Sequence, residues 1–343
     1  MICRPQPYLA GLASPRPIGV RAWIEWRLVD RFGKSSAAGH QHNLILNKGL
    51  DWFLANLWAE KALYYLAVGT GSAAPANTDT GLGAEVARTI ATSLTSTRIS
   101  NGVYQIERNF TFDYSVANYN NTEFGASWSA SNVDGTLTRE LFRDGANNPI
   151  VITKTSNEQL IIKYILQITM SPVVQTNEAD IIFKNNSGVQ VDSRLTAEIW
   201  NESSFGPNPN GKGDYSWIAD NEYAATTPVR GMQYHSASMV MAYTGDVTGS
   251  GIQDADSNLG APLQAYVNGN YYRDVIATMN PGAGDVVVYG YSFRMRSGDF
   301  TTPAANKGTY LLRFRNADGT DNPFTKLADY KLKLGIRFSL ARG

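Results

Sequence analysis

The stretch LIIKYILQITM, residues 160–170, decides the fold class of this chain. Its large apolar side chains alternate, so that Leu160, Ile162, Tyr164 and Leu166 fall on one face of an extended segment. Alternation with a period of two is typical of a β-strand with one buried face. Further strands are predicted at residues 23–29, 103–114, 123–129 and 136–143, and the short, fully apolar run at 63–68 is suited to a buried strand. The sequence therefore predicts a mainly β protein.

One segment has the period of an α-helix instead. Asn47 is suited to cap its N-terminus, and Leu50, Phe53, Leu54 and Leu57 recur at spacings that place them on one helical face. One short helix among many strands joined by turns predicts a sandwich or a small barrel, and we favour a jelly-roll-like sandwich.

A hairpin sequence recurs in the second half of the chain. Residues 141–149, LFRDGANNP, are echoed about 172 residues later by residues 313–323, RFRNADGTDNP, and an alternating strand follows each copy. Half of the 343 residues separates the copies, which predicts two tandem β-sandwich domains related by duplication. The alternative is two unrelated β domains that use similar turn residues. The predicted boundaries are an extended N-terminal arm at 1–20, a first domain at 21–172 and a second at 173–343.

Composition excludes several classes of protein. Thirty basic residues balance thirty acidic ones, and charged residues make up only 17% of the chain, so no basic excess predicts nucleic-acid binding. Cys3 is the single cysteine, which excludes an internal disulfide framework and favours folding in a reducing cytoplasm. No run of apolar residues is long enough to predict membrane insertion.

The N-terminal arm is locally basic and rich in proline. Arg4, Arg16 and Arg21 lie in or beside it, and Pro5 and Pro17 are two of its four prolines. A solvated tail and an arm that docks on a neighbouring subunit both fit this composition.

The metal candidates are sparse. His40 and His42 are alternate residues, so their side chains would point the same way in an extended segment, and copies related by symmetry could share one metal ion. A plain polar loop is the simpler interpretation. Asp254, Asp256 and Asn258 have the spacing of a calcium loop but lack its glycine and its final carboxylate, which favours a solvated loop.

No catalytic motif is recognisable. The sequence contains no Gly-x-Ser-x-Gly elbow, and its three histidines offer little material for a triad or a zinc hydrolase. The loop that begins at Gly69 does not end in Gly-Lys-Ser/Thr, so a phosphate site is not predicted either. We therefore expect no enzymatic activity, no cofactor and no resident metal.

Three motifs resemble structural proteins of tailed-bacteriophage virions. They are NLILNKGL at residues 43–50, LAVGTGSAAPANTDTGLGAE at 66–85 and GTLTRELF at 135–142, followed by the strand at 160–170. In that family a short helix precedes an AVGTG-x-x-AP loop, and a hairpin and a long strand close the domain. The resemblance covers about residues 22–170 and implies a non-enzymatic virion component of the tail fibre, baseplate or neck. The second half has no copy of the AVGTG loop.

The resemblance implies symmetric assembly, as a trimer or hexamer, and contacts with other virion proteins. The low charge density suits broad uncharged contacts between subunits. Two alternatives stay open: a capsid decoration protein, and a module that binds a host receptor or glycan. For the latter the contact surface would be the aromatic loops of residues 206–262. Their candidate residues are Tyr215, Trp217, Tyr223 and Tyr234.

Overall fold

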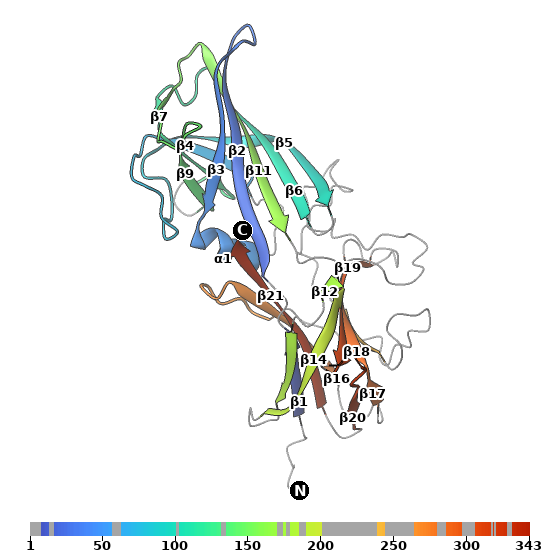
Figure 1. Ribbon diagram of the computed structural model, residues 1–343. Coiled ribbons are helices and arrows are strands. Elements are labelled where there is room, and N and C mark those ends of the chain that lie inside the picture. Colours follow the sequence, from blue (N-terminus) through green and yellow to red (C-terminus); the bar gives the residue numbers. More distant parts are fainter. Residues whose placement is uncertain are drawn as a thin grey trace.

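The computed structural model describes residues 8–13, 17–56, 63–100, 103–131, 135–169, 174–175, 179–184, 190–200, 239–243, 264–279, 286–296, 306–316, 318, 320–327 and 331–343. In these parts the chain is mainly β with one helix, which confirms the predicted class. Figure 1 shows two groups of strands, with helix α1 (Asn47–Asn56) at the level where they meet. No helix of the described parts is long and apolar enough to span a bilayer.

Eight strands of the first half form a ring. Each pairs antiparallel with the next in the order β2–β3–β9–β8–β4–β5–β6–β11, and β11 returns to pair with β2. In a closed antiparallel sheet of this size side chains can fill the interior. The strands are β2 (Ile18–Asp30), β3 (Ser35–Ile45), β4 (Tyr65–Gly69), β5 (Glu85–Ser100), β6 (Val103–Phe112), β8 (Glu123–Ser127), β9 (Thr138–Leu141) and β11 (Glu158–Thr169).

Two strands that turn a corner close this ring. The first part of β5 pairs with β4, and after a bulge between Ala91 and Ser93 the rest pairs with β6. In the same way β3 pairs with β2 as far as Asn43 and then with β9 at Leu44 and Ile45. Bulges and bends of this kind let one strand pair with one neighbour along its first part and with another along its second part. The result is a barrel-like sheet in place of the sandwich that the sequence predicts.

A second group of strands follows the order β16–β21–β1–β13–β14–β19–β18–β15. Only β1 and β21 are parallel within it. The pairing does not divide the chain into two tandem sandwiches, because β21 also pairs with β2 and joins both groups into one network of 17 strands. The strands are β1 (Tyr8–Ala13), β13 (Ala179–Lys184), β14 (Gln190–Trp200), β15 (Met239–Tyr243), β16 (Tyr272–Met279), β18 (Gly290–Arg296), β19 (Asn306–Arg315) and β21 (Lys331–Arg342).

The segment predicted as an extended arm, 1–20, contains strand β1 at residues 8–13. Strand β1 lies between β21 and β13, parallel to the former and antiparallel to the latter, and β2 then continues beside β21 where Ile18 pairs with Leu340. The segment YLAGLA is short and has no clear alternation of polar and apolar residues, so its sequence gives little sign of a strand. Residues 8–13 therefore pair with strands of the protein's own second half.

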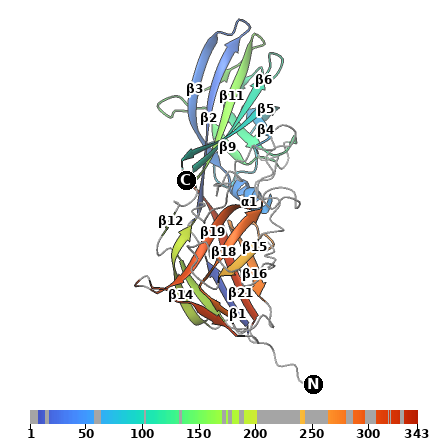
Figure 2. The ribbon, with the colours of Figure 1, turned by 90° about the vertical axis from the view of Figure 1, so that its right-hand side faces the viewer.

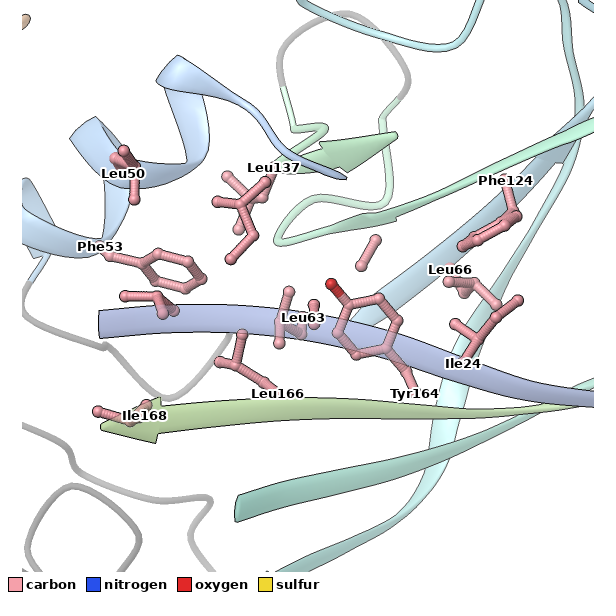
Figure 3. Packing of buried hydrophobic residues seen from close by; sticks show 14 of the residues in the cluster. Ile24, Leu50, Phe53, Leu63, Leu66, Phe124, Leu137, Tyr164, Leu166 and Ile168 are labelled. Carbon is pink, nitrogen blue, oxygen red and sulfur yellow. The ribbon is translucent and has the colours of Figure 1, made fainter. Parts of the chain in front are cut away.

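The core of the ring is built from alternating residues. Every second residue of β2 and β11 is buried, and Figure 3 shows Ile24, Tyr164 and Leu166 pointing into the same interior. Leu50 and Phe53 from α1 enter this cluster, so the helix packs against one end of the ring. Burying each such side chain contributes about 1.5–3 kcal/mol, which explains why the helix forms where its apolar stripe predicts it.

The pairing order of the first group recurs in the second. The run β3–β9–β8–β4 corresponds to β14–β19–β18–β15, and Figure 2 shows the second run in the lower body of strands. Short two-stranded sheets flank each run, β7 (Asn120–Asn121) with β10 (Ile152–Thr153) and β17 (Val286–Val288) with β20 (Phe324–Lys326). A further short strand, β12 (Val174–Gln175), pairs with β14.

The echoed hairpins have the same hydrogen bonds. Phe142 donates its N–H to the Thr122 carbonyl, and Ile150 donates to the Phe142 carbonyl. In the second half Phe314 donates to Tyr289, and the N–H of Asn322 donates to the Phe314 carbonyl. Phe142 and Phe314 are both fully buried. The sequence echo thus corresponds to one local structure that occurs twice.

Candidate functional site

The loop between β4 and β5 is wrapped around one buried carboxylate. Glu123, at the start of β8, is fully buried. Its Oε1 accepts hydrogen bonds from the N–H groups of Gly71 (3.0 Å) and Ala84 (2.7 Å), and its Oε2 accepts one from Gly83 (3.0 Å). Residues 66–85, which carry the family resemblance, therefore have this carboxylate at their centre.

Arg139 on β9 ties the same loop to the sheet. Its Nε donates to Glu123 Oε2 at 2.8 Å, its Nη1 to Asp79 at 2.5 Å and its Nη2 to the Ala73 carbonyl at 3.0 Å. Only 4% of the Arg139 side chain is exposed, so these are charge-assisted bonds in a poorly solvated setting. Both arms of the loop are thus fixed by one guanidinium group.

The electrostatics of the cluster keep its ions charged. Burial by itself raises the pKa of Asp79, but the hydrogen bond from Ala76 and the charge of Arg139 outweigh it and hold this pKa below its usual value. Burial by itself lowers the pKa of Arg139, whereas the bonds to Asp79 and Glu123 raise it above the ordinary arginine value. Asp79 and Arg139 are therefore both ionised at neutral pH.

Every lone-pair position of the Glu123 carboxylate is already used by a hydrogen bond. A carboxylate offers about four lone-pair positions, and Glu123 accepts one bond from Arg139 and three from backbone N–H groups. A general acid or base needs a position open to a substrate. Any side chain at Gly71 would collide with the Glu123 carboxylate, so the glycine is needed for this close approach. We interpret the cluster as a device that holds the loop in shape.

A second polar cluster joins helix α1 to the second half. Asp51 accepts hydrogen bonds from the Tyr266 hydroxyl and from the Gly269 N–H, the latter at 2.7 Å. The Arg273 guanidinium donates to the carbonyls of Leu54 and Ala55 at 2.9 and 3.0 Å, which caps the C-terminal end of the helix. These contacts fix the helix against residues more than 200 positions away in sequence.

A groove of about 650 Å³ lies on the outer face of the ring, across β3, β2, β11 and β6. Pairing places His40 opposite Glu25, and Glu25 opposite Lys163. The Lys163 ammonium lies 3.1 Å from Glu107 and 3.9 Å from Glu25, so the charges on this face are largely balanced. The lining residues are Glu25, Trp26, Arg27, Ala38, Gly39, His40, Asn109, Ile161 and Lys163.

The tip of the β2–β3 hairpin presents an aromatic ring to solvent. Phe32 is 96% exposed, the highest value among the large exposed hydrophobic residues of the described parts. Asp30 fixes the turn, since its Oδ1 accepts hydrogen bonds from the N–H groups of Phe32 and Lys34, both at 2.9 Å. Gly33 supplies the left-handed conformation, with φ of 80°. The ring is therefore held out on a well-defined turn.

The predicted histidine pair lies on a strand and not in a loop. His40 and His42 are in β3, where both are exposed on the face that also bears Glu25 and Trp23. The prediction that they point the same way is confirmed, since both are exposed on one face of β3. The polar-loop interpretation is wrong, because residues 35–45 form a continuous strand of the β2–β3 hairpin. Within the described residues no three His, Cys, Asp or Glu side chains are placed to hold a metal ion.

The other predicted site residues divide into two sets. Arg21 is exposed on β2, opposite Gln167 of β11. The remaining candidates lie outside the described residues, so their predictions stay predictions; these are Cys3, Arg4, Arg16, Tyr215, Trp217, Tyr223, Tyr234, Asp254, Asp256 and Asn258.

Sequence reasoning missed Glu123, Arg139 and Phe32. Glu123 and Arg139 belong to strands predicted from their apolar neighbours, and their charges gave no reason to expect burial. The available signal was the glycine-rich loop, whose many free N–H groups require an acceptor when they are buried.

No model of a protein family, no curated protein and no solved structure matches this chain significantly.

Proposed function

We propose that the protein is a non-enzymatic structural component of a tailed-bacteriophage virion, a tail, neck or baseplate accessory or fibre protein that assembles symmetrically and bridges other subunits. The observation that carries this proposal is the use made of residues 66–85. The loop that bears the family resemblance directs its N–H groups at Glu123 and its Asp79 at Arg139. The charge of Asp79 and the buried N–H groups of the loop are thus used to hold its shape, as expected of a rigid building block.

A duplication of one β unit supports the same proposal. Corresponding strand runs, flanking two-stranded sheets and hairpin hydrogen bonds recur in the two halves, in the same chain order. We infer that the second half arose as a copy of the first. A chain with two related units suits a structure in which rings of different symmetry meet, since three copies present six similar units.

Three measurements test the proposal. Particles released by the host should contain the chain at a fixed copy number after gradient purification, measured by quantitative mass spectrometry against the major capsid protein. Immunogold labelling should then place it on tails or necks, whereas labelling of heads alone would indicate a decoration protein. Mass photometry of the purified chain should show a defined oligomer. Absence from purified particles would refute the virion assignment.

A further inference from the structure

A buried lysine beside the sheet of β7 and β10 lacks an ionic partner. Lys154 directly follows β10 and is 2% exposed, and no carboxylate of the described residues forms an ion pair with it. Its Nζ donates instead to the side-chain oxygen of Asn118 at 2.8 Å and to the Thr155 carbonyl at 3.3 Å. Both acceptors are neutral. Because burial of an unpaired charge costs free energy, the charged form of this amine is disfavoured.

The Asn118 amide is fixed next to this amine. Its Nδ2 donates to the Tyr114 carbonyl at 2.9 Å, which leaves Oδ1 to face Lys154. The preceding residue, Ala117, has a left-handed φ of 59° although it is not a glycine, a strained conformation that is often found at functional sites. The carbon of an amide lies ~1.2 Å from its oxygen, so Cγ of Asn118 is at most ~4 Å from Nζ of Lys154. An amine and a carbonyl carbon are thus held within reach of each other.

A carboxylate that acts on this amine has one oxygen to spare. Asp113 Oδ1 accepts hydrogen bonds from the Gln159 side chain at 2.9 Å and from the Tyr114 N–H at 2.8 Å, whereas Oδ2 accepts none in the described part of the chain. These bonds lower the pKa of Asp113, so it is a base at neutral pH. Burial lowers the pKa of Lys154 and outweighs the charges of Asp113 and Glu158, which raise it.

We propose that Lys154 and Asn118 become joined by an isopeptide bond. The lone pair of the neutral Lys154 Nζ attacks Cγ of Asn118, the Nζ–Cγ bond forms, the Cγ–Nδ2 bond breaks, and the former Nδ2 leaves as ammonia. Asp113 takes the proton that Nζ loses and passes it to Nδ2, so atoms and charges balance. Asn118 is exposed, which gives the ammonia a way to solvent. Each molecule reacts only once, so a small share of neutral amine at neutral pH is enough.

The bond closes a covalent loop of residues 118–154. This loop contains β8 and β9, and with them the ion pair of Glu123 and Arg139. A crosslink of this kind restricts the unfolded chain and so favours the folded state. The reaction also turns a buried amine into a neutral amide, which removes the cost of burying its charge. The inference goes beyond the proposed function and does not depend on it.

Peptide mapping of the full chain tests the bond. Trypsin cleaves after arginine and free lysine and passes over a lysine whose amine is acylated. The expected product is a branched peptide in which residues 109–139 are joined to residues 144–163, lighter by one ammonia molecule than the two peptides together. The intact denatured chain should show the same loss of mass. Lys154→Met and Asn118→Ala should each abolish both signals. The control Lys163→Arg removes another amine of the same segment, keeps the trypsin site and should leave the bond in place.

A timed experiment tests the part played by Asp113. Chain made by cell-free synthesis is sampled at intervals, and the fraction that yields the branched peptide is measured. Asp113→Asn keeps the size of the side chain and removes its basicity, so the bond should form about 100-fold more slowly. Glu158→Gln is the matched control, because both Glu158 oxygens already accept hydrogen bonds, from Ser36 and from Thr155. Its rate should equal that of the parent.

Recovery of residues 144–154 and 155–163 as separate peptides, from a parent chain of full mass, would overturn the bond. A loss of ammonia that persists in Lys154→Met would overturn it too, because it would locate the reaction at another amide. Equal rates for Asp113→Asn and the parent would refute the role of Asp113. None of these results depends on where the chain lies in a particle, so the virion assignment is decided separately by gradient purification and immunogold labelling.

Discussion

Replacement of Glu123 by glutamine tests whether the carboxylate holds the loop of residues 66–85. Glutamine keeps the volume of the side chain but replaces one oxygen by an NH₂ group, which is a donor. In the folded protein three backbone N–H groups and the Arg139 guanidinium converge on the two oxygens. At least one donor would therefore face another donor, and Arg139 would keep Asp79 as its remaining carboxylate partner.

The size of the effect follows from burial. Removing one partner of a buried ion pair typically costs about 3–5 kcal/mol, and Glu123 is fully buried while 4% of Arg139 is exposed. A loss of this size lowers the midpoint of thermal unfolding by roughly 6–20 °C for a unit of ~150–250 residues. Urea unfolding followed by tryptophan fluorescence measures the free energy. Hydrogen exchange measures the protection of the Gly71, Gly83 and Ala84 amides, which should fall sharply.

Glu25→Gln is the matched control, because it makes the same chemical change where 54% of the side chain is exposed and the nearest cation is 3.9 Å away. An exposed pair of this kind contributes at most about 1 kcal/mol, so the control should stay close to the parent protein. The interpretation of Glu123 is refuted if Glu123→Gln unfolds within about 1 kcal/mol of the parent and the three amides keep their protection.

Three further outcomes are expected. Asp79→Asn should be less stable than the parent at neutral pH. This difference should begin to shrink as pH falls below about 4, where unfolded Asp79 takes up its proton, and should go on shrinking as pH falls through the lowered pKa of folded Asp79; urea unfolding at pH 2, 3 and 7 measures it. Gly49→Ala should destabilise by about 1–3 kcal/mol despite the better helix propensity of alanine, because a side chain there meets the Leu137 carbonyl; a gain in stability would contradict this close packing. Removal of residues 2–13 deletes β1 and should raise hydrogen exchange in β13 and β21 but not in β3 or β9; equal protection in all four strands would contradict the pairing of β1.

The sequence predicts best the elements whose pattern is local. The alternation in residues 160–170 marks β11, and the spacing from Leu50 to Leu54 marks α1, because the pattern of burial that stabilises each element is visible in the element itself. Strands β3 and β5 escape prediction. Their exposed faces are rich in Ser, Thr and Ala, and their pairing partners decide that they are strands.

Closure of the barrel and the buried ion pair depend on contacts that no local pattern contains. The Gln41 side chain on β3 bonds to the Leu141 carbonyl and the Arg143 N–H, and Asn43 bonds to Thr138, so polar residues of β3 join it to β9 and the residues that follow. In the sequence these residues look like those of a polar turn. Glu123 is missed for the same reason, because its backbone hydrogen-bond donors come from a loop 39 to 52 residues away in the sequence.

The two groups of strands differ in the neighbours of their corresponding strands. In the first half β11 pairs directly with β2, whereas in the second half β1 is inserted between β21 and β13, the strands in the corresponding places. The described strands of the second group number eight with β1 included, as in the ring, so β1 changes which strands are neighbours and not their number. The hairpin at 313–323 lies away from the insertion, between β19 and β20, and it is the part of the copy that keeps its sequence. The two halves therefore differ at the position of β1 and agree at the hairpin.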